Sequence, residues 1–143
     1  MIRVKFVSIP VSDQDRALAF WTEKVGLKVT TDAPMGPGQR WIELEIPGED
    51  TGLVLFTPEG HEDRIGGFVP MGFGAADVQA EYERLTANGV EFQQPPRTEP
   101  WGTSAIFKDP DGNQFVIGSE PDSEGASDLH GGDAGTKGMG SAG

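Results

Sequence analysis

Two stretches of the chain carry hydrophobic residues with a helical period, and each is flanked by segments with strand-like patterns. In the first stretch the apolar positions follow i, i+3, i+4 and i+8: Ala17, Phe20, Trp21 and Val25. In the second they follow i, i+4 and i+7: Val78, Tyr82 and Leu85. This spacing predicts two amphipathic helices, each with one apolar face to bury against a sheet.

The predicted helix ends are marked by the same residue types in both halves. Asp13 and Asp77 stand at the starts, where a carboxylate can accept hydrogen bonds from the free N–H groups of the first turn. Gly26 and Gly89 stand just after the ends, where a left-handed residue is needed. The separations between the equivalent residues are 64 and 63 positions, which indicates a weak internal repeat.

Period-2 patterns and turn residues place four strands in each half of the chain. The expected strands cover residues 4–11, 27–31, 39–46 and 53–57, then 67–75, 90–93, 103–108 and 114–118. We therefore predict an α+β fold of two βαβββ modules, with mixed and antiparallel sheets curling around a shared cleft. The modules span about 2–57 and 67–118 with a linker at 58–66, and the loops 32–38 and 94–102 are the expected rims.

Composition limits the partners of this chain. The formal net charge is −12, of which residues 1–118 carry −8, and no basic stripe is present, so nucleic acid is not an expected partner. Residues 119–143 hold seven Gly and five acidic residues with little apolar content, which predicts a disordered tail after a single domain at 1–118. There is no Cys, no signal-peptide pattern and no apolar run near the ~20 residues that span a bilayer, so we expect a cytoplasmic protein without membrane contact.

Two motifs resemble those of the vicinal oxygen chelate superfamily, the glyoxalase/bleomycin resistance protein/dioxygenase family. Val11-Ser12-Asp13 with the Phe20-Trp21 pair and the closing Val25-Gly26-Leu27 resembles the family's opening helix. The run 107–113, Phe-Lys-Asp-Pro-Asp-Gly-Asn, resembles the F-x-D-P-D-G-N turn near its end. The resemblance implies a glyoxalase-like fold, a homodimer, and in the family's enzymes a divalent metal held by His, Gln or Glu from four strands.

The resemblance places those four ligand positions at Phe6, Glu43, Met71 and Val116, with Gly72 one residue away from the third. Phe and Val have no donor atom, and a thioether prefers soft ions, so only Glu43 suits a hard divalent cation. The two His residues, His61 and His130, fall in the linker and the tail. We therefore expect neither a metal site nor another cofactor.

Strand alternation gives the expected lining of the cup. Ile42, Leu44 and Ile46 should face the helix, which leaves Trp41, Glu43 and Glu45 on the other side. The remaining candidate ligand-binding residues are Phe6, Ser8, Met71, Phe73, Trp101 at the rim, and Val116. Gly72 and Gly74 are expected on the helix side. An apolar, aromatic lining with a few carboxylates is typical of a small-molecule pocket.

Three functions remain open on the sequence alone. The favoured hypothesis is a binding module that sequesters a small hydrophobic or cationic molecule, as in drug resistance. The alternative is a metal-dependent lyase, isomerase or dioxygenase of the glyoxalase type, with Glu43 as the candidate catalytic residue. A third is a domain that interacts with proteins through its dimer surface. Independently of these functions, Trp41 and Trp101 could be stacking platforms for a ligand or could serve in ordinary core or dimer packing.

Overall fold

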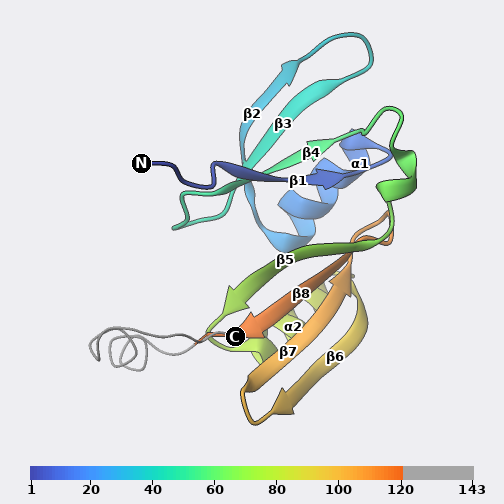
Figure 1. The fold of residues 1–143 in the computed structure, drawn as a ribbon. Helices are drawn as coiled ribbons and strands as arrows, with labels where there is room; N and C mark the ends of the chain where they lie inside the picture. Colours follow the sequence, from blue (N-terminus) through green and yellow to red (C-terminus); the bar gives the residue numbers. More distant parts are fainter. Residues whose placement is uncertain (121–143) are drawn as a thin grey trace.

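The computed structural model describes residues 1–120, so the expected tail lies outside the described residues from position 121 onward. Residues 1–120 form two four-stranded mixed sheets with few helices (Figure 1), which confirms the predicted α+β class. None of the helices described over this range is long and apolar enough to cross a membrane.

The first sheet, called sheet A, has the strand order β1-β4-β3-β2. Its strands are β1 (Phe6–Pro10), β2 (Lys28–Pro34), β3 (Arg40–Glu45) and β4 (Gly52–Phe56). Strand β1 pairs with β4 in parallel, and the other two pairs are antiparallel. Between β1 and β2 the chain forms α1 (Gln14–Ala19), which continues as the π-helix η1 (Phe20–Val25).

The second sheet, called sheet B, repeats this topology with the order β5-β8-β7-β6. Its strands are β5 (Phe68–Ala75), β6 (Glu91–Glu99), β7 (Gly102–Lys108) and β8 (Gln114–Ser119), and α2 (Val78–Ala87) follows β5. Strand β5 is again parallel to its partner β8, and the other pairs are antiparallel. A short 3-10 helix, η2 (Glu62–Arg64), lies between the two sheets in the sequence.

Both predicted helix starts and both predicted glycine ends are present. Asp13 accepts a hydrogen bond from the backbone N–H of Arg16, and Asp77 accepts one from Ala80, each at 3.0 Å. Gly26 and Gly89 have φ of 100° and 92°, a left-handed conformation that favours glycine. Local chemistry therefore defines the helix ends in the same way in the two modules.

Two strands, β2 and β6, extend beyond their predicted ends into the expected rim loops. Strand β2 runs on to Pro34 and β6 to Glu99, so only short hairpin tips separate them from β3 and β7. Strand β6 even contains Pro95 and Pro96, which a strand tolerates where its N–H groups need no partner. Both β2 and β6 are edge strands, which explains why Pro34, Pro95 and Pro96 can belong to them.

A single hydrophobic core joins the two modules. The inner face of sheet A contributes Ile9, Ile42 and Leu44, each 0% exposed, and α1 and η1 pack against it. Trp21, also fully buried, extends this core to sheet B, where its ring lies 5.1 Å from Phe115 and in contact with Phe73 and Phe107. The first helix is therefore shared between the two sheets.

The Asp-Pro-Asp-Gly-Asn turn adds polar bonds between the modules. Asn113 is fully buried, and its amide donates to the carbonyl of Pro10 at 2.8 Å and accepts from the backbone N–H of Gly66 at 2.7 Å. Asp111 accepts hydrogen bonds from the backbone N–H and the hydroxyl of Ser12. It also forms an ion pair with Arg16, with Nη2 and Oδ1 2.8 Å apart. The turn thus holds the junction between β1 and α1.

Candidate functional site

The outer face of sheet A, opposite the core, carries an aromatic pair beside a carboxylate. Phe6 of β1 and Trp41 of β3 pack edge to face, with ring centroids 5.2 Å apart and an interplanar angle of 82°. The indole Nε1 of Trp41 donates to Oε1 of Glu43 at 3.3 Å. Ile42 and Leu44 of the same strand point into the core. Trp41 and Glu43, which alternate with them, therefore share the outer face.

Val54 on β4 completes this apolar patch, and the sequence prediction did not include it. Val54 pairs with Ser8 and Glu43, and it is 1% exposed although it does not belong to the main core cluster. The signal was present in β4, where Leu53-Val54-Leu55-Phe56 is an unbroken apolar run. Such a run indicates burial on both faces of a strand, not on one.

The carboxylate of Glu43 belongs to an acidic hollow at one end of this face. The hollow has a volume of about 120 Å³ and includes four acidic residues: Glu43, Glu45, Glu49 and Asp50. Gly52 forms part of it, and a Cβ atom there would meet Oε2 of Glu43 at 3.0 Å. An aromatic surface and a concentration of negative charge therefore lie side by side on sheet A.

Arg40, at the start of β3, is occupied by acidic neighbours. It donates to Asp32 from Nε and Nη2 at 3.1 Å each and to Asp15 from Nη1 at 2.6 Å. The hydrogen bonds from this guanidinium lower the pKa of Asp32 below its ordinary value. Arg40 therefore serves to tie β2 and α1 to β3.

Two side chains that were expected in the cup face the core instead. Phe73 contacts the rings of Trp21, Phe107 and Phe115, and Met71 packs against the same core. A one-residue change in register exchanges the two faces of a strand, and burial of the Phe73 ring stabilises the observed one. Gly72 and Gly74 consequently lie on the outer face, and not on the helix side as expected.

The other expected residues lie outside the core, on different elements. Ser8 and Glu45 are exposed on sheet A, and Val116 is half-buried on the outer face of sheet B, paired with Gly72 and Ile106. Trp101 is 78% exposed at the tip of the hairpin between β6 and β7. The structure thus brings together Phe6, Trp41, Glu43 and Glu45, while Val116 and Trp101 belong to sheet B.

The donor set offers little to a divalent metal. Of the four ligand positions that the motif resemblance implies, Glu43 alone presents an oxygen donor, and Met71 packs against the core. Across residues 1–120, no group of three or more His, Asp or Glu side chains is arranged to hold a metal ion. The residues present at this site do not fit the metal centre of the family's enzymes.

The two-module α+β fold is that of the glyoxalase-like class of proteins, and a match to a family model identifies the superfamily. The family model described as Glyoxalase/Bleomycin resistance protein/Dioxygenase superfamily matches residues 3–117, so the chain belongs to this superfamily. The uncharacterized protein YetH of Bacillus subtilis is 40% identical over 114 residues, which cover 78% of this chain and 92% of YetH.

Solved structures of related proteins share both fold and sequence with the chain. A superfamily member from Sphaerobacter thermophilus is 34% identical with a TM-score of 0.76, covering 84% of this chain and 98% of that one. TnmS3, an antibiotic binding protein from Streptomyces sp. CB03234, is 34% identical with a TM-score of 0.73, covering 85% and 98%. The superfamily thus includes an antibiotic-binding relative of this chain.

Proposed function

We propose that this protein captures a small hydrophobic, cationic molecule on the outer face of sheet A, without a metal, as a resistance-type binding protein. The observation that carries the proposal is the Phe6–Trp41 pair beside the carboxylate of Glu43. The likeness to the antibiotic-binding TnmS3 supports it, because both chains have the same fold at 34% identity. Phe6, which stands where the resemblance implies a metal ligand in the family's enzymes, would here serve as part of an apolar lining.

The chemistry of the face suits a flat cation. The face of an indole ring attracts a positive charge, with a contribution of ~0.5–2 kcal/mol per cation–π contact. The four carboxylates around the acidic hollow add attraction for the same charge, and the net charge of −12 extends it over longer distances. A neutral ring of equal size would keep the stacking contacts and lose both electrostatic contributions.

The proposal includes a homodimer, in which a second copy covers the outer sheet faces and completes the cup. Its support is the family resemblance together with half-buried apolar residues on both outer faces, among them Phe6 on sheet A and Val116 on sheet B. A cytoplasmic location remains a prediction from the sequence.

Calorimetric titration of the purified protein with 9-aminoacridine, a flat cation at neutral pH, tests the function, with neutral acridine as the matched probe. We expect the cation to bind at least about tenfold more tightly than the neutral ring, since each tenfold step is ~1.4 kcal/mol. Trp41→Ala should abolish most of the binding of both probes. Glu43→Gln should weaken the cation selectively, because it keeps the shape of the side chain and removes its charge.

The matched control is Glu91→Gln, which removes an exposed carboxylate on β6 that pairs only loosely with Lys108 at 3.6 Å. It should leave both affinities unchanged. Equal affinities for the two probes, or full binding by Trp41→Ala, would contradict the proposal. Binding that disappears on treatment with a chelator and returns with added metal would favour the enzymatic alternative instead.

A further inference from the structure

A second hollow lies between the two modules, and its lining shares no residue with the acidic hollow of sheet A. Its volume is about 570 Å³, within the ~300–1,000 Å³ typical of small-molecule sites. One wall comes from the end of η1 and the loop after β3, with Val25, Leu27 and Pro47. The other comes from β5 and α2, with Phe73 and Glu81. We call this hollow the intermodule pocket.

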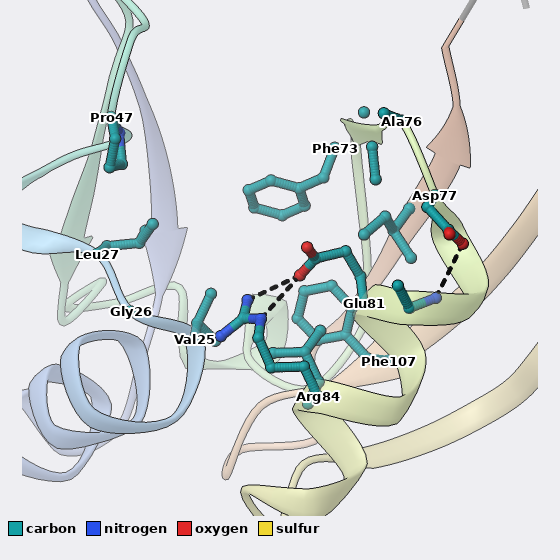
Figure 2. Close-up of a pocket in the computed structure, with 15 residues that line it drawn as sticks. Val25, Gly26, Leu27, Pro47, Phe73, Ala76, Asp77, Glu81, Arg84 and Phe107 are labelled. Carbon is teal, nitrogen blue, oxygen red and sulfur yellow. Dashed lines mark hydrogen bonds and ion pairs between the residues drawn. The ribbon is translucent and has the colours of Figure 1, made fainter.

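The walls of the intermodule pocket are mainly apolar. Phe73 is only half-buried, although its ring already contacts Trp21, Phe107 and Phe115 on its inner side. Figure 2 shows the ring of Phe73 across the open space from Leu27 and Pro47. A ligand that buries this apolar surface gains a binding free energy of ~25 cal/mol per Å² removed from water.

The polar groups of the pocket lie on one face of α2 and carry an excess of negative charge. Arg84 donates from Nε to Oε1 of Glu81 at 2.9 Å, and its Nη2 forms an ion pair with the same oxygen at 2.9 Å. In Figure 2 these bonds engage one oxygen of the Glu81 carboxylate, and the carboxylate lies between Arg84 and Phe73. Asp77, one turn earlier, caps the helix through Oδ1. The lining thus holds two carboxylates and one guanidinium, and the guanidinium pairs with Glu81.

We propose that the intermodule pocket binds a small amine, with its ammonium group on the carboxylate of Glu81 and its apolar body between Leu27 and Phe73. A carboxylate shared with Arg84 keeps acceptor capacity for a further charge-assisted hydrogen bond. The excess of acidic groups in the lining selects a cation over an anion. Because the pocket has walls from both modules, the bound amine also bridges them.

The pocket is independent of the sheet A site, and the two can be tested separately. The probes form a matched series with the same ring and chain: 2-phenylethylamine, 2-phenylethanol and phenylacetate. In two-dimensional NMR titrations of the isotope-labelled full-length protein, the amine should shift the resonances of residues 25–27 and 73–81. Trp41→Ala should leave this binding unchanged, even if it removes binding of flat cations on sheet A.

The amine should bind about tenfold more tightly than the alcohol, the ratio expected for one charge-assisted contact worth ~1.4 kcal/mol, and phenylacetate should not bind. Glu81→Gln should reduce the affinity for the amine to that for the alcohol. The matched control is Glu83→Gln, which alters an exposed carboxylate on the same helix that accepts a hydrogen bond from Gln79. It should change nothing.

A second variant, Ala80→Trp, fills the pocket from α2 and should abolish binding of both the amine and the alcohol. Three results would overturn the proposal: tighter binding of phenylacetate than of the amine, an unaltered affinity in Glu81→Gln, or shifts confined to Phe6, Trp41 and Glu43. Glu81→Gln preserves side-chain volume, so the test stands even if the larger substitution prevents folding.

Discussion

Trp21 is the residue on which the connection between the two modules depends most. It is 0% exposed and lies in aromatic contact with Phe20 of its own helix and with Phe73, Phe107 and Phe115 of sheet B. Its indole Nε1 is buried with no hydrogen-bond partner among the described residues. The apolar contacts of the ring therefore outweigh the cost of one unsatisfied donor, ~1–3 kcal/mol.

Truncation of this side chain should be severe. We expect Trp21→Ala to lower the free energy of unfolding by ~3–5 kcal/mol, because it removes a large buried ring and leaves a cavity between the modules. Trp21→Phe should cost much less, since the smaller ring keeps part of the packing and removes the unsatisfied donor. Urea denaturation of both variants measures the difference, and equal losses would contradict this view of Nε1.

At the scale of elements, the Asp-Pro-Asp-Gly-Asn turn between β7 and β8 also bonds to the end of β1 and to the segment before β5. Asp109 is 6% exposed and accepts from the backbone N–H groups of Asp111 and Asn113 and from the amide of Asn113. Desolvation by burial is the largest effect on this carboxyl and raises its pKa above the ordinary 3.8, although the hydrogen bonds from Asn113 oppose it.

This raised pKa gives an unusual pH dependence. The folded state holds the Asp109 proton more tightly than the unfolded chain, so the carboxyl's contribution to stability grows as pH falls through the folded pKa toward 3.8. In Asp109→Asn that titration is absent. The unfolding free energy of the wild type minus that of the variant should therefore increase as pH falls from 7 to 4. A constant or decreasing difference in urea titrations would contradict the prediction.

At the scale of the whole molecule, one core lies between the sheets and two outer faces remain uncovered. Phe68, on β5, is 56% exposed, and Val116 and Ile106 pair with each other on the outer face of sheet B. The sheet A face carries Phe6 and Trp41. Apolar side chains left accessible on a sheet face are typical of ligand or subunit contacts.

Light scattering on the purified protein should therefore give a mass near twice the 15.2 kDa of one chain. Val116→Arg, which places a charge on the outer face of sheet B, should shift the protein toward the monomer. Gln79→Arg on exposed α2 is the control and should not. A monomer at all concentrations would refute the dimer and leave binding on sheet A alone to be judged by calorimetry.

The sequence anticipated much of the fold and part of the site. Trp41, Glu43 and Glu45 alternate with Ile42 and Leu44 as expected, because an apolar-polar alternation reports directly which face is buried. The prediction failed at Met71 and Phe73. In β5, Val69, Met71 and Phe73 form one apolar alternating set, with Pro70 and Gly72 between them. The prediction put Met71 and Phe73 in the cup because the resemblance gave a ligand position at Met71, and this outweighed the apolar pattern.

What the sequence determined by itself is local: the helix ends at Asp13, Gly26, Asp77 and Gly89, the turn residues, and the repeat of two modules. These follow from backbone conformation and nearby hydrogen bonds, which depend on residues a few positions apart. The tertiary structure decided that Trp21 joins sheet B and that Phe73 faces inward, and it created the intermodule pocket. Such features depend on packing between segments about 50 or more residues apart, which no local pattern encodes.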